Sequence, residues 1–202
     1  MTKHLSESER RAQILRSARE VFIEKGYVNC RVEDIAKRAG LSKGAVYFYF
    51  ASKREVFLSL IREEHENTYS FLDKANEDHR PAAEKLIDLG RKYVNYFAGL
   101  NTPPRFFLMM AEQSIRDDEI REEVQAVHQR FVDAAARIYA QGVAEGSFRP
   151  LDPIAVATLL KSLIDGFAGQ AAIGRRPSPE LLLTDGVKFL LHGIAVRPDE
   201  KP

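Results

Sequence analysis

The segment from Gly40 to Lys53 constrains the fold of this chain more than any other; its sequence is Gly-Leu-Ser-Lys-Gly-Ala-Val-Tyr-Phe-Tyr-Phe-Ala-Ser-Lys. It follows a short amphipathic segment, residues 32–39, and precedes a long one that opens at Ser52. Two short helices joined by a Gly-containing turn, with polar and basic residues at the start of the second, are typical of a helix-turn-helix. The pattern therefore makes double-stranded DNA the first partner to consider.

Residues 45–50, Ala-Val-Tyr-Phe-Tyr-Phe, have a strong β-propensity and by local rules predict a strand. A lone strand among helices has no partner for its backbone groups. We therefore predict that tertiary context overrides propensity and that these residues form the second helix of the motif. Ser42 is the predicted N-cap of that helix.

The charge is distributed unevenly along the chain. Residues 1–54 carry 12 Lys/Arg against 6 Asp/Glu, a net of +6, whereas residues 55–202 carry 18 against 23, a net of −5. A basic N-terminal quarter on a mildly acidic body fits a nucleic-acid-binding head joined to a body that avoids DNA. Ordinary surface charge is the alternative interpretation.

Composition excludes several other classes. The hydrophobic content of 45% supports a real core, and 202 residues suffice for one sizeable domain or two small ones. Cys30 is the single cysteine, which excludes an intramolecular disulfide framework and a Cys-based zinc site. The first 11 residues lack the apolar core of a signal peptide, and no 18-residue apolar run predicts a membrane span. We expect a soluble, cytoplasmic protein without a cofactor or metal.

Helical periodicity dominates the rest of the chain, so the predicted fold class is all-α, with about nine helices. Gly26 and Gly40 are expected to end the first two helices as C-caps. Ser52 and Glu55 form the pattern of a capping box at the start of the fourth helix. The expected helices besides the motif's second cover residues 8–25, 32–39, 53–75, 82–99, a stretch opening after Asn101-Thr-Pro-Pro, 119–143, 153–173 and 178–195.

The last of these helices is apolar on more than one face. A helix with this pattern is buried on several faces. At the end of a chain, that predicts packing against a second subunit, and thus a homodimer formed through the last two helices. A well-buried terminal helix in a monomer is the alternative.

At this point the sequence resembles the TetR family of bacterial transcriptional regulators. The resemblance is carried, in order and spacing over residues 8–62, by Gly26-Tyr27, Asp34-Ile35-Ala36, Ala39-Gly40-Leu41-Ser42, Tyr47-Phe48-Tyr49-Phe50 and Ser52-Lys53. The rest of the chain matches only in helix count and layout. The resemblance implies a helix-turn-helix DNA-binding domain, residues 1–53, and a ligand-binding and dimerisation domain, residues 54–202, whose last two helices pair into a four-helix bundle.

Two positions depart from the family pattern. Arg31 stands where a helix-capping Thr is usual, and its guanidinium could instead clamp a phosphate at that helix N-terminus. Phe48 stands where a polar residue often contacts a phosphate, and packing against the protein is the alternative to a DNA contact at this position.

In a helix-turn-helix, the N-terminal residues of the second helix meet base edges in the major groove. Lys43 can donate to guanine, Gly44 lets the backbone approach the duplex, and Ala45 can touch a thymine methyl. The resemblance implies a phosphate contact for Tyr47, and Lys53 is expected to hold another. Lys43 as a solvated lysine and Tyr47 as a core aromatic are the alternatives. The predicted DNA-facing residues are Arg31, Ser42, Lys43, Gly44, Ala45, Tyr47, Phe48 and Lys53. Tyr49 and Phe50 are assigned to the core of the head, and a dimer would set two heads roughly 34–36 Å or more apart on a palindromic operator.

The body is rich in aromatics, which predicts an apolar cavity for a small hydrophobic or amphiphilic effector. The residues expected to line it are Phe71, Tyr93, Phe97, Phe106, Met110, Phe131 and Phe167, with Arg91, Gln113 and His128 as its polar groups. An ordinary filled core is the alternative. The resemblance implies that the effector shifts the fourth helix. The distance between the two heads then no longer matches the spacing of the grooves, and the operator is released, as in a repressor.

An enzyme is the first competing function, and we predict that the chain is not one. The serines lack a Gly-x-Ser-x-Gly frame, the histidines lack metal-site spacing, and Glu64-His65-Glu66 is expected to be a solvated helix face. A helical protein-interaction module that does not bind DNA is the second competing function. An activator, or a regulator without small-molecule induction, also stays open.

Overall fold

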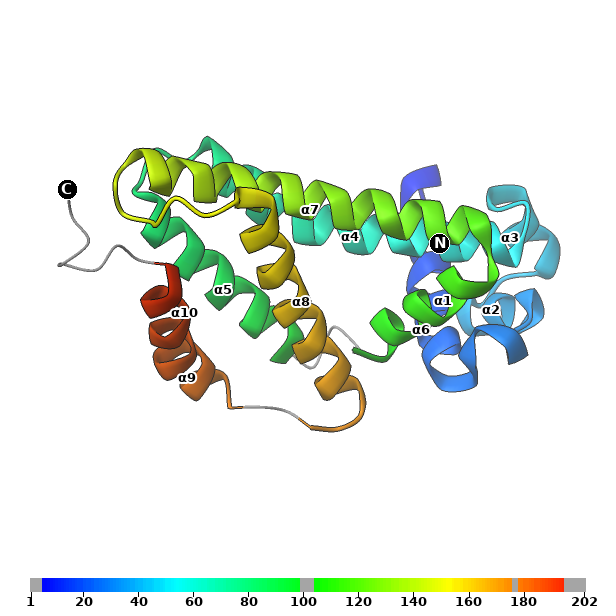
Figure 1. Ribbon diagram of the computed structural model, residues 1–202. Helices are drawn as coiled ribbons and strands as arrows, with labels where there is room; N and C mark the ends of the chain where they lie inside the picture. The colour runs from blue at the N-terminus through cyan, green and yellow to red at the C-terminus, as the bar shows by residue number, and fades with distance from the viewer. Residues whose placement is uncertain (1–4, 99–103, 176–177, 195–202) are drawn as a thin grey trace.

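The computed structural model describes residues 5–98, 104–175 and 178–194, and these residues are organised almost entirely in helices (Figure 1). The elements are α1 (Glu7–Asn29), α2 (Val32–Ala39), α3 (Lys43–Tyr49), α4 (Lys53–Glu77), α5 (Ala82–Ala98), α6 (Pro104–Arg116), α7 (Asp118–Ala144), α8 (Pro153–Ala172), and a C-terminal segment of α9 (Pro179–Leu181), a π-helical turn (Leu182–Gly186) and α10 (Val187–Ile194). Counting that segment as one helix, the described chain has nine, which confirms the predicted all-α class. None of the described helices combines the length and apolarity needed to cross a membrane.

Side-chain caps begin several of the helices. The Oγ atom of Ser42 accepts from the N–H of Ala45 at 3.1 Å, so residues 43–49 are a helix, as predicted, and not a strand. The Oγ atom of Ser52 accepts from the N–H of Glu55 at 3.1 Å. The predicted capping box there is only half formed, because the Glu55 carboxylate accepts from the N–H of Ala51 rather than from that of Ser52.

Two glycines with positive φ shape the ends of α1 and α2. The φ of +76° at Gly26 breaks α1, as predicted, although the helix resumes for one further turn to Asn29. Gly40 has φ +66° and ψ 32°, the left-handed conformation that favours glycine. The N–H of Leu41 donates to the Ala36 carbonyl at 2.9 Å and that of Gly40 to the Lys37 carbonyl at 3.2 Å. These two bonds form a Schellman motif, which ends α2 and turns the chain toward α3.

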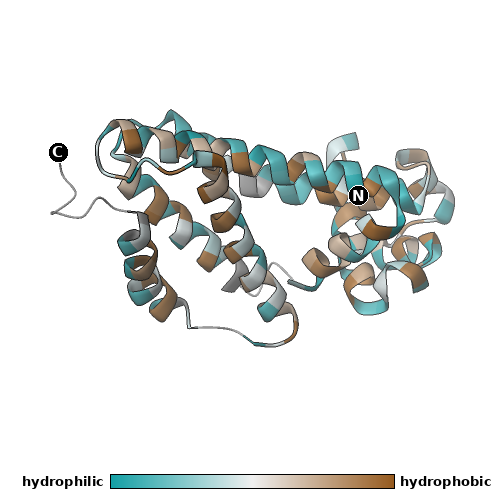
Figure 2. Ribbon diagram, viewed as in Figure 1, coloured by the Kyte–Doolittle hydropathy of each residue, from teal (hydrophilic) through white to brown (hydrophobic). Residues whose placement is uncertain are grey.

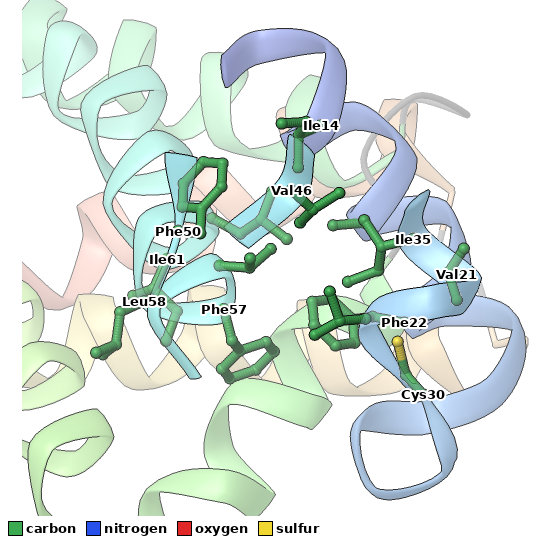
Figure 3. Close-up of a cluster of buried hydrophobic side chains, with 14 of the residues drawn as sticks. Ile14, Val21, Phe22, Cys30, Ile35, Val46, Phe50, Phe57, Leu58 and Ile61 are labelled. Carbon is green, nitrogen blue, oxygen red and sulfur yellow. The ribbon is translucent and has the colours of Figure 1, made fainter. Parts of the chain in front are cut away.

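The three N-terminal helices enclose the core shown in Figure 3. Ile14, Phe22 and Ile35 from α1 and α2 are completely buried there. Phe50 is 1% exposed and Tyr49 packs at the edge, which confirms their assignment to this core. The cluster continues into the body, through Phe57 and Ile61 of α4, Phe106 and Met110 of α6, and Ile120 of α7. Head and body therefore share one continuous apolar contact along α4 and α6.

The body is built on α4 and α7, which lie side by side and reach from the head to the far end of the molecule (Figure 1). Helices α5 and α8 pack against α7, and the C-terminal segment lies against α5. The second core cluster joins these elements, with Leu72, Tyr93, Phe131 and Tyr139 almost fully buried in it. Figure 2 shows apolar residues along α8 and the C-terminal segment, whereas α4 and α7 carry many polar residues.

Candidate functional sites

One face of α3 anchors it to the head and the other faces solvent. Val46 and Phe50 are buried in the core, whereas Lys43, Tyr47 and Phe48 are exposed. Ser42 and Gly44 are exposed and Ala45 is half-buried at the start of the helix. The structure thus gathers all six predicted α3 residues around one short, accessible helix.

Phe48 does not pack against the core, so the structure contradicts the packing alternative to a DNA contact at this position. Its side chain is 81% exposed and touches the neighbouring ring of Tyr49 edge-on, with ring centroids 5.1 Å apart. The reason is helical geometry: Phe48 follows the buried Val46 by two residues, or roughly 200° around the helix, so it must point outward. A large apolar ring therefore stands on the surface of the motif beside Tyr47.

Lys43 is held in place by a neighbouring carboxylate. Its ammonium lies 2.5 Å from the Glu33 carboxylate of α2 and 5.7 Å from the centroid of the Tyr47 ring. The hydrogen bond from Lys43 lowers the pKa of Glu33. Both side chains of the pair are about half exposed, so solvent screens the attraction and Lys43 can exchange Glu33 for another acceptor.

Lys53 is bonded to the protein rather than presented to solvent. Its ammonium donates to the carbonyls of Tyr27 at 2.7 Å, Cys30 at 2.9 Å and Val28 at 3.4 Å, and lies 4.5 Å from the Tyr27 ring centroid. An ammonium has three N–H donors. A phosphate contact by Lys53 would therefore replace at least one of these bonds.

Arg31 occupies the N-cap of α2 without capping it. Its side chain is exposed and forms no capping bond, whereas its backbone N–H donates to the Asp34 carboxylate at 3.0 Å. The hydrogen bond from Lys25 and then this backbone bond lower the pKa of Asp34. Because Asp34 satisfies the helix end, the Arg31 guanidinium is left at the surface beside the N-terminus of α2.

The body contains a cavity of about 250 Å³ between α4, α5, α6, α7 and α8, here called the polar cavity. Its wall consists of Glu64, His65, Tyr93, Tyr96, Phe106, Phe107, Met110, Ala111, Ser114, Val124, Val127, His128, Phe131, Lys161, Ile164 and Asp165. A second cavity of about 240 Å³, here called the apolar cavity, lies between α5, α7, α8 and the C-terminal segment. The two cavities share Tyr93, Phe131 and Ile164, so they adjoin across these side chains.

The structure brings together six of the ten predicted ligand residues. Phe106, Met110 and His128 line the polar cavity, Phe167 lines the apolar cavity, and Tyr93 and Phe131 line both. Of the four other predicted ligand residues, Phe97 has a side chain outside the described part of the chain.

The other three line neither cavity. Phe71 packs behind the wall, with its ring edge-on to Tyr93 at 6.0 Å. Arg91 is 58% exposed and pairs with Asp88 at 3.4 Å, because it lies two residues from Tyr93 and so on the opposite face of α5. Gln113 is 5% exposed but is buried within the packing of α6 rather than at a cavity wall.

Sequence reasoning missed the charged side chains of the polar cavity. Glu64 is 8% exposed and His65 is 7% exposed, so the prediction that Glu64-His65-Glu66 is a solvated face was wrong for these two and right for Glu66. They follow Ile61 by three and four residues and continue the buried stripe of α4. This spacing from Ile61 is the sequence signal that could have identified Glu64 and His65 as buried. Lys161 and Asp165, one turn apart on α8, are the further charged pair in the wall.

The charges of the polar cavity are matched in pairs. The Glu64 carboxylate accepts hydrogen bonds from the Arg19 guanidinium of α1 and from the Tyr96 hydroxyl of α5. Lys161 pairs with Asp165, and its ammonium lies 5.9 Å from the Phe107 ring centroid and 5.7 Å from that of Phe131.

His65 adds no charge to this cavity at neutral pH. Burial, reinforced by the charge of Lys161, lowers its pKa to about 3, so its imidazole is neutral. Within the described residues, no group of three or more His, Cys, Asp or Glu side chains is placed to hold a metal ion. The charged side chains of the cavity wall are thus the Glu64 carboxylate, held by Arg19, and the Lys161–Asp165 pair.

Comparison with known proteins shows which families and relatives this chain is similar to. The family model described as bacterial regulatory proteins, tetR family, matches residues 14–60, and that of the C-terminal part of BetI-type transcriptional repressors matches residues 104–192. The chain is 30% identical over 171 residues to the transcriptional repressor AcnR of Corynebacterium efficiens, which covers 81% of this chain and 82% of the relative. It is 27% identical over 196 residues to the transcriptional regulator YfiR of Bacillus subtilis, covering 95% and 94%.

A solved structure is similar over almost the whole chain. A transcriptional regulator from Saccharomonospora viridis, crystallised in complex with choline, superposes with a TM-score of 0.79 at 26% identity, covering 95% of this chain and 100% of that one. Each of these three similar proteins is described as a transcriptional regulator or repressor and not as an enzyme.

Proposed function

Because the chain belongs to the TetR family of bacterial transcriptional regulators, we propose that it is a ligand-responsive repressor that binds a palindromic operator as a homodimer. The observation that carries the proposal is the arrangement of α3, whose Val46 and Phe50 are buried while Lys43, Tyr47 and Phe48 face solvent. A short helix held in this way can enter a major groove without unfolding the head.

Base edges and phosphates are contacted by different residues of the head. Lys43 leaves Glu33 and donates to guanine, and Phe48 contributes apolar contact to a thymine methyl, as Ala45 also can. Tyr47 and Arg31 hold phosphates, which fixes the register of α3 in the groove. The net charge of +6 over residues 1–54 supplies the sequence-independent attraction to the duplex.

Exposed apolar side chains support a homodimer through α8 and the C-terminal segment. Leu159 is 67% exposed, Leu163 43%, Leu181 62% and Phe189 79%. Both elements line the apolar cavity, and water-exposed apolar surface of this extent is typical of an interaction face. A two-fold axis would bury the same patch on both subunits and set two α3 helices on successive half-sites.

The effector site in this proposal is the polar cavity. Helix α4 begins at Lys53, a short turn after the end of α3, and carries Glu64 and His65 into the cavity wall. A ligand that fits one position of α4 better than another shifts the balance between DNA-binding and released states. The relative that was crystallised with choline supports a small organic effector. The largely aromatic and aliphatic wall supports one with an apolar part.

The test is a salt titration of duplex binding. Fluorescence anisotropy with a labelled random duplex should give an affinity that falls steeply with salt, because basic residues displace counterions. Lys43→Ala and Tyr47→Ala should weaken binding with an unchanged unfolding midpoint, whereas the matched control Lys74→Ala, at an exposed site on α4 far from α3, should not. A protein indifferent to duplexes in dilute buffer would favour the alternative, a helical interaction module that uses the exposed Phe48 to bind another protein. An activator without induction would instead bind duplexes and ignore every cavity ligand.

A further inference from the structure

We propose that Glu33 of α2 reads DNA together with Lys43 of α3, and that the two residues recognise one guanine–cytosine base pair in each half-site. Lys43 donates to the guanine and Glu33 accepts from the cytosine. This inference rests on the proposed function and names the base pair that the same surface reads. Sequence reasoning did not place Glu33 among the DNA-facing residues, because only the fold brings it against Lys43.

The fold places Glu33 on the surface that α3 presents to a duplex. Its carboxylate lies 2.5 Å from the Lys43 ammonium, and the pair bridges the first turns of α2 and α3. That ammonium lies 5.7 Å from the ring centroid of Tyr47, and all three side chains are exposed. An acidic group therefore stands among the residues that meet DNA. There the phosphates repel it unless the duplex also supplies a hydrogen-bond donor.

The ion pair can separate at small cost. Both side chains are about half exposed, so water screens their attraction and hydrates each group when it leaves the other. The hydrogen bond from Lys43 lowers the pKa of Glu33, so the carboxylate is ionised at neutral pH and can only accept. When Lys43 turns to a base, Glu33 is thus left in need of an N–H donor.

The major-groove edge of a guanine–cytosine pair supplies what both side chains need. Guanine presents the acceptors O6 and N7, and cytosine presents the N4 amino group as a donor. O6 and N4 are bonded to each other within the base pair, so they lie roughly 2.9 Å apart. The ammonium and carboxylate, 2.5 Å apart in the free protein, have nearly this spacing. Each charge can therefore exchange the other for the base atom opposite it.

Other parts of a duplex satisfy the two charges less well. A thymine–adenine pair offers Lys43 the single acceptor O4 and places adenine N7, another acceptor, beside Glu33. A phosphate accepts from Lys43 but has no donor for Glu33 and repels it. Glu33 therefore weakens every contact of Lys43 except the one that satisfies both residues. Its role in this proposal is to determine specificity.

Affinities for two duplexes test this role. One duplex carries the half-sites that the wild type enriches from a random pool, and the other carries the same bases in scrambled order. Glu33→Ala should bind the selected duplex at least about fivefold more weakly than the wild type, because the cytosine contact is lost. It should bind the scrambled duplex as tightly or more tightly, because an acid that phosphates repel is gone.

The matched control is Glu20→Ala. Glu20 is an exposed acid of α1 that pairs with Arg38 of α2 at 2.8 Å, so this variant makes the same change in the charge of the head. It should shift both affinities together. A parallel shift of both affinities in Glu33→Ala would overturn the proposal, and so would enrichment by the wild type of another base pair where Lys43→Ala loses its preference.

A base analogue identifies the atom that Glu33 contacts. The base 2-pyrimidinone pairs with guanine but lacks the N4 amino group of cytosine. At the base pair for which Lys43→Ala loses its preference, it should weaken wild-type binding at least about threefold more than it weakens Glu33→Ala, because one hydrogen bond is lost. Equal losses in the two proteins would show that Glu33 only positions Lys43, and would overturn the proposal.

A second variant and the wild type complete the test. If Glu33→Ala unfolds, Glu33→Met keeps the length of the side chain and a good helix propensity, and should give the same results with both the scrambled duplex and the analogue. A wild type that selects duplexes while the Glu33 variants keep its full selectivity would overturn this inference alone. A wild type that binds no duplex would overturn the proposed function, and this inference with it.

Discussion

The ammonium of Lys53 lies 2.7 Å from the carbonyl oxygen of Tyr27, so the first residue of α4 closes the connection between α1 and α2. The same ammonium reaches the Cys30 carbonyl at 2.9 Å and lies over the ring of Tyr27. This contact joins the long helix of the body to the end of the first helix of the head. It makes Lys53 a structural residue of the head in addition to any role at DNA.

Lys53→Met should destabilise the protein by about 1–3 kcal/mol, because the three carbonyls lose their donor while the apolar stem is kept. Urea unfolding monitored by circular dichroism measures the change. Lys37→Met, at an exposed position on α2, is the matched control and should leave the midpoint in place. An unchanged midpoint for Lys53→Met together with weaker duplex binding would show that Lys53 serves a phosphate instead.

Gly142→Ala should destabilise the body by roughly 1–3 kcal/mol or more. A Cβ atom at this position would lie 2.1 Å from the Phe148 ring, which itself stacks on Tyr139 with centroids 5.2 Å apart. Gly90→Ala in α5 is the control, because a Cβ added there would meet no packing neighbour within 4 Å, and it should be neutral or stabilising by up to about 1 kcal/mol. Thermal unfolding of the two variants side by side decides the matter, and equal stability would contradict this account of the α7–α8 connection.

The stability of the protein should fall below pH 6.5 in a way that depends on His65. Burial holds the pKa of the folded imidazole near 3, whereas the unfolded side chain takes up a proton below about 6.5. Protonation thus favours the unfolded chain, and stability is lost as the pH falls from 6.5 toward 3. Between pH 7.5 and 5.5 the wild type should lose about 1 kcal/mol more than His65→Gln. Parallel losses in the two proteins would show that His65 is hydrated in the folded state.

The helices were predictable because their signals are local. Ser42, Gly40 and the apolar spacing of the head fix α2 and α3 without knowledge of distant contacts. The interpretation of residues 43–49 as a helix needed one non-local argument, that a strand there would lack a partner. The outward position of Phe48 follows from the buried Val46 and helical geometry, which decides between the two alternatives that the sequence left open at this residue.

The cavity was harder to predict because its charges are paired across the fold. Glu64 belongs to a buried stripe, but its partners Arg19 and Tyr96 are 45 and 32 residues away along the chain. No sequence spacing connects them. Aromatic residues such as Tyr93 and Phe131 were predicted correctly because large aromatic side chains are usually buried in the interior of a domain. Arg91 was misplaced because a charge near aromatics says nothing about the face of the helix on which it lies.

The most direct measurement for the central claim is selection of bound duplexes from a random pool, read by sequencing, with the wild type, Lys43→Ala and the Lys43→Ala, Tyr47→Ala double variant. The account predicts that the wild type enriches two inverted half-sites, that Lys43→Ala relaxes the preference at one base pair of each half-site, and that the double variant enriches little. Equal enrichment of the same sequences by all three proteins would contradict the assignment of α3 as the helix that reads DNA.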